Sequence, residues 1–295
     1  MALKNRLKNR YKITFWLFIA PCVLLFTVFF LIPLILSIGF SFTNYDGWKT
    51  MDFVGLKNYS KLFADNNFYS AMGRTFIFTL LCLPFMVVIP LLLAVLVTNR
   101  YVKGKGMVRT MLYIPVLLSP LVVGVTINWM YSQEYGIVNY IIESLGGTAM
   151  EWALNPMLAT FVIGFAVNWA AAGFYMIIYV GGIKNISSDL YEAASIDGAS
   201  ALQSFFKITV PMLAPTTFLV LLLSTINLLK EYAVVQGITL GGPGTSTTFI
   251  IQYIFSKGFN QNEYGYASAI STVVMLVFIV IAYVQFKASK GGETY

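Results

Sequence analysis

Long apolar runs dominate the pattern of hydrophobic and polar positions along the chain. A lipid hydrocarbon core of about 30 Å requires roughly 20 apolar residues in a helix. Six runs with few or no charged residues reach about this length, and they do not alternate as barrel strands do. We therefore expect an all-α membrane protein with six transmembrane helices. The runs are Ile13–Phe40, Phe76–Val97, Met111–Met130, Leu158–Val180, Met212–Val235 and Ala267–Phe286.

The composition agrees with a chain that uses lipid as its solvent. Hydrophobic residues make up 58% of the 295 residues and charged residues 11%, about half the charged fraction of an ordinary soluble domain. Aromatic residues, at 16%, fit belts of Trp and Tyr at the two membrane interfaces. The first apolar run is too long for a cleavable signal peptide, so we expect it to stay as a helix.

The distribution of Lys and Arg predicts the orientation of these helices. Basic residues crowd the segments 1–12 and 100–109, whereas the connection Tyr131–Met157 carries three glutamates and no basic residue. Because basic segments stay in the cytoplasm, six spans place both termini there. We expect a cytoplasmic basic tail at 1–12, a six-helix domain at 13–286 with a cytoplasmic loop at 184–211, and a cytoplasmic tail at 287–295. The formal net charge of +7 then serves orientation and anionic membrane lipid, and not nucleic acid.

The residue types needed for catalysis and metal binding are scarce. The chain has no histidine, and its two cysteines, Cys22 and Cys82, lie inside apolar runs. It contains neither a paired-carboxylate motif nor a GxxxxGK[ST] phosphate loop. We therefore expect no catalytic residue, metal site or cofactor in this chain. Any ATP and Mg²⁺ it depends on must bind to a separate subunit.

The fourth connection, Gly181–Pro211, is long for a loop between neighbouring helices. Ser187 or Ser188 can cap the start of a helix, and the acidic residues that follow favour its dipole. Gly198 would end or bend that helix. The pattern predicts a short helix, a glycine-centred turn and a second short helix. An amphipathic helix that lies on the membrane surface is the alternative.

Three motifs carry a resemblance to a known family. Glu192–Gly198 (EAASIDG) is followed after nine residues by Ile208–Pro211 (ITVP), and this spacing resembles the EAA loop of ABC importer permeases. Val210 stands where leucine is commoner. Leu240–Thr247 (LGGPGTST) resembles the GGP–ST loop of the maltose and glycerol-3-phosphate type of sugar permease, and Phe53–Tyr59 (FVGLKNY) resembles a segment common there.

The resemblance implies a type I ABC importer permease fold in which the EAA helix is a cytoplasmic coupling helix. It implies a heterodimer with a second homologous permease, two copies of a cytoplasmic ATPase, and an extracellular solute-binding protein that delivers the sugar. The residues implied in coupling to the ATPase are Tyr191, Glu192, Ala193, Ala194, Asp197 and Gly198.

Polar residues at membrane depth are costly and tend to face a cavity or the interior of the bundle. Helical spacing places Asn168 and Tyr175 on one face of the fourth span, and Asn227 and Glu231 on one face of the fifth. In maltose-type permeases, the positions that match Asn168, Ala171, Ala172, Tyr175, Leu228 and Glu231 line the sugar site. The full set of expected sugar contacts is Asn168, Ala171, Ala172, Tyr175, Asn227, Leu228, Glu231 and Tyr232. For Asn168 the alternative is a hydrogen bond between helices, and for Glu231 it is a place near the outer interface.

Taken together, these patterns predict a cell-membrane permease subunit of an ATP-driven importer that forms the path for an oligosaccharide. A permease for a phosphorylated polyol such as glycerol-3-phosphate is the alternative. Its anionic substrate would need a basic residue in the path, where Lys230 is the sole intramembrane candidate and the adjacent Glu231 argues against it. An ion-coupled secondary transporter would show internal repeats, which are not evident, and would leave the EAA loop unexplained.

The topology can be tested by labelling single cysteines from each side of the membrane, after Cys22 and Cys82 are replaced. We expect Asn155→Cys to react with a membrane-impermeant maleimide from outside and Gly104→Cys only after the membrane is opened. Labelling of both positions from outside would contradict the six-span arrangement.

Overall fold

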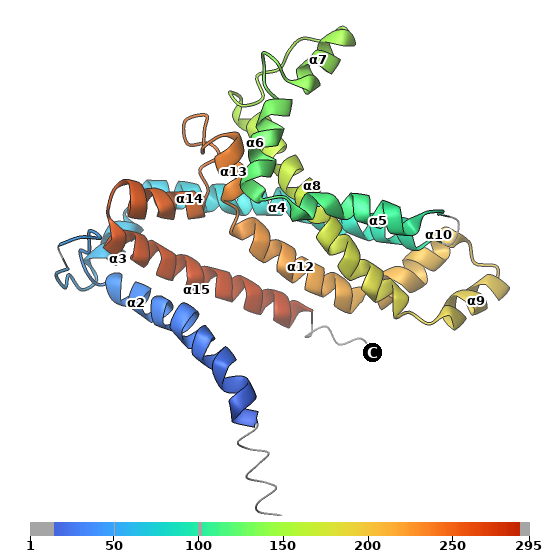
Figure 1. The fold of residues 1–295 in the computed structure, drawn as a ribbon, viewed down its shortest axis with the longest axis horizontal. Helices are drawn as coiled ribbons and strands as arrows, with labels where there is room; N and C mark the ends of the chain where they lie inside the picture. Colours follow the sequence, from blue (N-terminus) through green and yellow to red (C-terminus); the bar gives the residue numbers. More distant parts are fainter. Residues whose placement is uncertain (1–14, 50, 100–101, 290–295) are drawn as a thin grey trace, which may run out of the picture. The chain divides into compact units, whose positions relative to one another are not determined.

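The computed structural model describes residues 15–49, 51–99 and 102–289. Within these ranges the chain is helical between its loops, and an isolated β-bridge joins Thr43 to Phe53 (Figure 1). The expected basic tail at 1–12, Arg100 and the end of the chain from 290 lie outside the described residues. By contacts, the chain forms two compact units, one up to Asp65 with Ile254–Leu276 and the other comprising Asn66–Tyr253 with the residues from Val277 onward.

The first unit contains the apolar helix Phe15–Phe40 and the loop that follows it. The FVGLKNY motif folds this loop: the Asn58 side chain donates to the carbonyl oxygens of Ser41 (2.9 Å) and Thr43 (2.7 Å). The Tyr59 hydroxyl lies 2.7 Å from that of Ser41. These bonds satisfy backbone groups where the helix ends, so the motif closes a turn. The helical elements are η1 (Thr27–Leu31), α2 (Ile32–Phe40), α3 (Lys57–Phe63), η4 (Ser256–Asn260) and the first part of α15 (Tyr264–Ala288).

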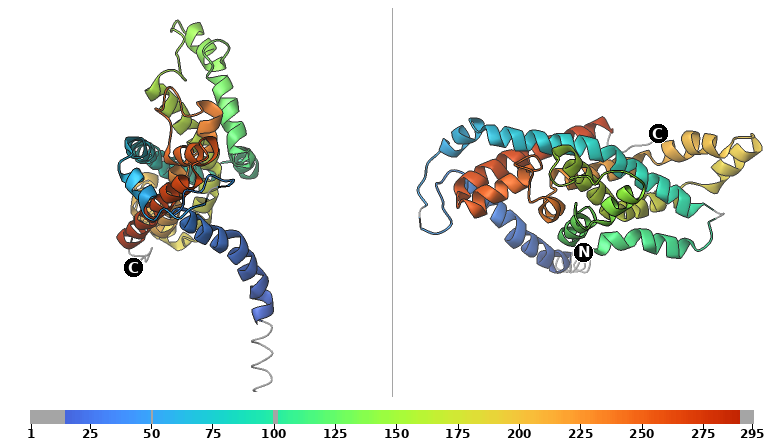
Figure 2. Two further views of the ribbon diagram at one scale, coloured as in Figure 1. Left: turned by 90° about the vertical axis from the view of Figure 1, so that its left-hand side faces the viewer. Right: turned by 90° about the horizontal axis from the view of Figure 1, so that it is seen from above.

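The second unit holds most of the helices (Figure 2). In chain order they are α4 (Asn66–Thr98), α5 (Lys105–Tyr113), η2 (Ile114–Leu117), α6 (Pro120–Met130), α7 (Ile137–Ser144), α8 (Pro156–Lys184), α9 (Ser188–Ile196), α10 (Ala201–Ser204), η3 (Phe205–Thr209), α11 (Val210–Met212), α12 (Ala214–Leu229), α13 (Ala233–Ile238) and most of α14 (Ile250–Phe255). The long helices α4 and α8 pack side by side, α12 packs against both, and α13 crosses α6. Fully buried side chains such as Phe78, Met176 and Tyr179 form the core between them.

Four of the six expected runs are single long apolar helices: Phe15–Phe40, Asn66–Thr98, Pro156–Lys184 and Tyr264–Ala288. The other two are bent pairs, and the count reaches six if each pair is one span. The number of spans and the side on which the termini lie therefore stay predictions. Gly104 has a left-handed φ of +68°, which a cysteine tolerates poorly. The exposed Lys103 beside it is the better position for labelling.

The third expected run, Met111–Met130, is not one straight helix. The helical segments Lys105–Leu117 and Pro120–Met130 meet at 98°. Between them Leu118 and Ser119 are extended, with ψ of 143° and 133°. Proline disfavours helical backbone in the residue before it, so Pro120 explains why the helix stops at this point.

The fifth expected run, Met212–Val235, is also interrupted. Segment Ala201–Met212 bends by 67° into Ala214–Leu229, and a non-helical break separates α12 from the short helix α13. Hydropathy alone did not reveal either break, because the residues on both sides are apolar.

The fourth connection confirms the expected helix, turn and helix. The Ser187 side chain accepts a hydrogen bond from the backbone of Asp189 at the start of α9 (3.3 Å). Gly198 has a left-handed φ of +77°, and Ser200 and Gln203 form a capping box at α10. Helices α7 and α9 lie beyond opposite ends of α8 (Figure 1).

Two glycines allow α6 and α13 to cross at backbone distance. A Cβ atom on Gly124 would lie 2.5 Å from the carbonyl oxygen of Val234 and 2.9 Å from the Cα of Gly237. A Cβ on Gly237 would lie 2.8 Å from the Cα of Gly124. Because backbone atoms cannot swing aside, any side chain here must push the two helices apart.

We therefore expect Gly124→Ala to lower the stability of the purified protein by about 1–3 kcal/mol, the usual cost of overpacking. Thermal unfolding in detergent measures this. Gly181→Ala is the matched control, because no atom lies within 4 Å of a Cβ at that helical position. Equal melting temperatures for the two variants would show that the crossing is not tight.

Candidate functional site

A pocket of about 320 Å³ opens inside the second unit where its helices are broken. It lies between α8, the broken segment after α5, the last part of α12 and the start of α13. The residues that line it are Pro115, Val116, Leu118, Pro120, Val167, Ala170, Ala171, Phe174, Tyr175, Leu223, Asn227, Glu231 and Val234.

Close packing next to the break builds one wall of this pocket. A Cβ on Gly173 would clash with the carbonyl oxygen of Leu112, so the end of α5 packs directly against α8. The chain then leaves helical geometry at Leu118 and Ser119 and turns away into α6. Space that a continuous helix would have filled is thereby left open beside α8.

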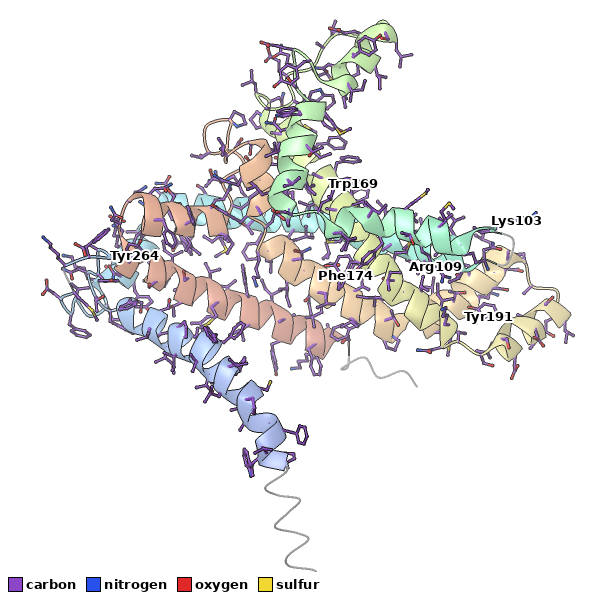
Figure 3. All side chains as sticks on the ribbon, viewed as in Figure 1. Lys103, Arg109, Trp169, Phe174, Tyr191 and Tyr264 are labelled. Atoms are coloured by element: carbon purple, nitrogen blue, oxygen red, sulfur yellow. The ribbon has the colours of Figure 1, made fainter. Side chains whose placement is uncertain are left out.

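The polar groups of the pocket come from α8 and α12. Tyr175 is 2% exposed, and its hydroxyl faces the side chains of Ser224 and Asn227 across the gap between the helices. Phe174 is 43% exposed and lies midway along the unit (Figure 3). The pocket therefore combines aromatic surface with neutral hydrogen-bonding groups, which is the usual composition of a small-molecule site.

Glu231 is the pocket's carboxylate and is 8% exposed. Its Oε1 accepts a hydrogen bond from the backbone N–H of Val234 (2.9 Å), one of the N–H groups that a helix start leaves unpaired. The carboxylate thus caps α13 at the break after α12. The capping bond uses Oε1 of the carboxylate, and the side chain also forms part of the pocket wall.

The structure brings four of the eight expected sugar contacts into this pocket: Ala171, Tyr175, Asn227 and Glu231. The other four do not line it. Asn168 donates to the carbonyl oxygen of Gly164 in its own helix (2.8 Å) and lines an apolar groove between α4 and α8. Leu228 is fully buried in the core, and Ala172 and Tyr232 are absent from the lining. The bond that the Asn168 amide nitrogen donates therefore stays within α8.

Sequence reasoning missed the pocket residues that the helix break supplies. Pro115, Val116 and Leu118 looked like ordinary positions in an apolar run. The available signal was the pair of prolines, Pro115 and Pro120, because each proline removes a helical hydrogen bond and Pro120 also restricts its predecessor. Phe174 precedes the expected residue Tyr175 in α8, and Leu223 lies one helical turn before the expected residue Asn227 in α12. Helical spacing from these two residues could therefore have indicated both.

The expected coupling residues lie on α9 and the turn after it. Glu192, Ala193, Asp197 and Gly198 are exposed, and Ala194 is half-buried. Ile196 was not among them, yet it is 87% exposed, so it gives this surface an apolar side chain. Tyr191, labelled in Figure 3, is half-buried and differs from the others, because its hydroxyl is bonded inside the protein.

The GGPGTST motif forms a loop that is closed by its own hydroxyl groups. The Thr247 hydroxyl donates to the carbonyl oxygen of Gly242 (2.6 Å) and lies 2.8 Å from the Thr239 hydroxyl. Nε of Arg74, on α4, donates to the carbonyl oxygen of Thr248 (3.1 Å). The loop has no regular secondary structure to pair its backbone groups, so the hydroxyl of a threonine in the motif supplies hydrogen bonds instead.

A helical membrane protein with a pocket at breaks in its apolar helices has the architecture of a membrane transport protein, in which irregular backbone lines the cavity. Residues 62–289 match the family described as binding-protein-dependent transport system inner membrane component, and the chain belongs to this family.

Similarity to characterised relatives extends over almost the whole chain. The lactose transport system permease protein LacF of Rhizobium radiobacter is 32% identical and is covered over 97% of both chains. The arabinooligosaccharides transport system permease protein AraP of Bacillus subtilis (strain 168) is 33% identical over 93% of this chain and 88% of its own. A bacterial ABC transporter involved in the import of the acidic polysaccharide alginate has a similar fold, with a TM-score of 0.85, 25% identity and coverage of 98% and 99%. That alginate transporter has also been solved in complex with an alginate pentasaccharide-bound periplasmic protein.

The capping role of Glu231 predicts a difference between two substitutions. Glu231→Ala removes the acceptor for the Val234 N–H and should lower stability by about 0.5–2 kcal/mol, as loss of a helix cap does. Glu231→Gln keeps an acceptor oxygen and should lose clearly less. Thermal unfolding in detergent compares them, with the exposed neighbour Lys230→Ala as control. If the Gln variant loses as much as the Ala variant, the carboxylate acts through its charge and not as a cap.

Proposed function

We propose that this chain is the permease subunit of an ATP-driven, binding-protein-dependent importer and forms the path for an oligosaccharide across the cell membrane. The observation that carries the proposal is the pocket in which Tyr175 of α8 faces Asn227 of α12 beside the ring of Phe174. A sugar presents hydroxyl groups at its edges and apolar C–H patches on its faces. An amide, a phenol and an aromatic ring are the groups that bind these two kinds of surface.

The charge of the pocket favours a substrate without phosphate. Neither Lys nor Arg is among the lining residues, and Glu231 is acidic. An anionic substrate would place its charge near a carboxylate in a medium of low dielectric constant, where repulsion is strong. A neutral saccharide therefore fits better than glycerol-3-phosphate. The transport of lactose and arabinooligosaccharides by relatives is consistent with this choice.

The partners follow from the same function. A periplasmic or extracellular solute-binding protein would deliver the sugar, as the complex of the alginate transporter supports. We further propose that a second homologous permease completes the path and that two copies of a cytoplasmic ATPase bind ATP and Mg²⁺. Helix α9, which exposes Glu192 and Ile196, would be the surface that contacts the ATPase, with both termini of this chain on the same side. Membership of the binding-protein-dependent family disfavours an ion-coupled secondary transporter.

The proposed sugar site makes a prediction that separates two faces of α8. Tyr175→Phe and Asn227→Ala each remove a hydrogen-bonding group, so uptake at limiting substrate should fall by about 2- to 12-fold, which corresponds to about 0.5–1.5 kcal/mol. Uptake of a radiolabelled oligosaccharide by cells that express the complete importer measures this. Asn168→Ala is the matched control, because Asn168 lies outside the pocket and should leave uptake near that of the wild type.

Co-purification of the partner subunits must remain normal for these comparisons to count. Wild-type uptake in both pocket variants, together with loss of uptake in Asn168→Ala, would move the sugar site to the groove between α4 and α8.

A further inference from the structure

Helix α9 is attached to the rest of the second unit by few contacts. Within the described part of the chain, it packs broadly against no other helix, and most of its side chains are exposed. If α9 contacts the ATPase, it can pass on the movement of the ATPase only where one of its residues is held firmly by the rest of the unit.

Tyr191 supplies the attachment. Its hydroxyl lies 2.9 Å from Oγ1 of Thr209, which is 18 positions further along the chain. Among the described residues, it is through this bond that an α9 side chain is linked to a residue outside its own helix. Thr209 is 6% exposed, so water competes little for the bond. The Tyr191 ring also packs against the hydrophobic core, as does the partly buried Ile208.

The Thr209 side of this bond leads through α11 into α12. Thr209 is the last residue of η3, a turn of π-helix, and such turns often occur at functional positions in helices. Two residues later, at Pro211, the chain approaches the 67° bend that leads into Ala214–Leu229. That helix carries Asn227 into the pocket. This hydrogen bond therefore joins a side chain of the exposed helix to the segment that leads into the helix ending at the pocket.

We propose that the hydrogen bond between Tyr191 and Thr209 is the positioning link that makes α9 and the base of α12 move as one body. This inference rests on the proposed function of α9 as the contact with the ATPase. Tyr191 then does not serve as a contact residue of that surface. It transmits the movement of the surface to α12, so that closing of the ATPase changes the pocket.

The test uses the complete importer in proteoliposomes. Tyr191→Phe and Thr209→Val each remove one partner of the bond with little change in shape, whereas Thr209→Ser keeps the hydroxyl. We expect assembly, melting temperature and basal ATP hydrolysis to stay near wild-type values in all three. Stimulation of hydrolysis by the sugar-loaded binding protein, and uptake per ATP, should fall by about 2- to 10-fold in the Phe and Val variants, the scale of one hydrogen bond. The Ser variant should keep most of both.

The double variant Tyr191→Phe with Thr209→Val should lose no more coupling than either single variant, because both remove the same bond. Full coupling in both single variants overturns the proposal. So does a loss of assembly that runs parallel with a lower melting temperature, since that result assigns the bond a purely structural role.

A cross-link separates this outcome from failure of the proposed function. Ile196→Cys on α9 should cross-link to a cysteine on the ATPase in the assembled importer, and Glu192→Ala should weaken association. If the cross-link forms while Tyr191→Phe stays fully coupled, the link alone is wrong. If no cross-link forms and Glu192→Ala associates normally, α9 is not the ATPase contact, and the proposal fails together with that part of the function.

Discussion

The central constraint on this protein is that a helix inside lipid cannot stop without giving its backbone N–H and C=O groups other partners. In the second unit, the third and fifth apolar runs are interrupted around Ser119, at Leu213 and between Leu229 and Ala233. At the last break the Glu231 carboxylate accepts from the Val234 N–H, and at the first a proline has no N–H to satisfy. The first and the last of these breaks line the pocket, in space that straight helices would have filled.

The positions of the breaks also explain how the pocket acquires its chemistry. Because the segment after α5 turns away, one face of α8 is left open, and Tyr175 and Asn227 face each other there. The tight crossing of Gly124 and Gly237 holds α6 and α13 against each other on the far side of the break. Rigid walls of this kind fix polar groups in place, which reduces the ordering cost when a ligand binds.

The long helices were predictable from the sequence because their signal is summed over about 20 residues. The turn at Gly198 was predictable because its chemistry is local. The breaks were not recognised, since a hydropathy average does not register two extended residues such as Leu118 and Ser119. For the site, spacing placed Asn168 and Tyr175 on one face but could not say which neighbour each side chain meets. The bond from Tyr191 to Thr209 is a contact between distant positions, and one sequence carries no local signal for it.

The buried Glu231 has a consequence for how the protein is made. During synthesis, each segment must pass from the translocon into the bilayer, and an acidic or basic residue makes that step less favourable, most strongly at the centre of the segment. The fifth apolar run carries Lys230 and Glu231 side by side near its end, before α13 exists to be capped. Insertion of this run is therefore less favourable than that of an uncharged run, and α4 and α8, already in the membrane, offer a protein surface against which its polar side chains can pack.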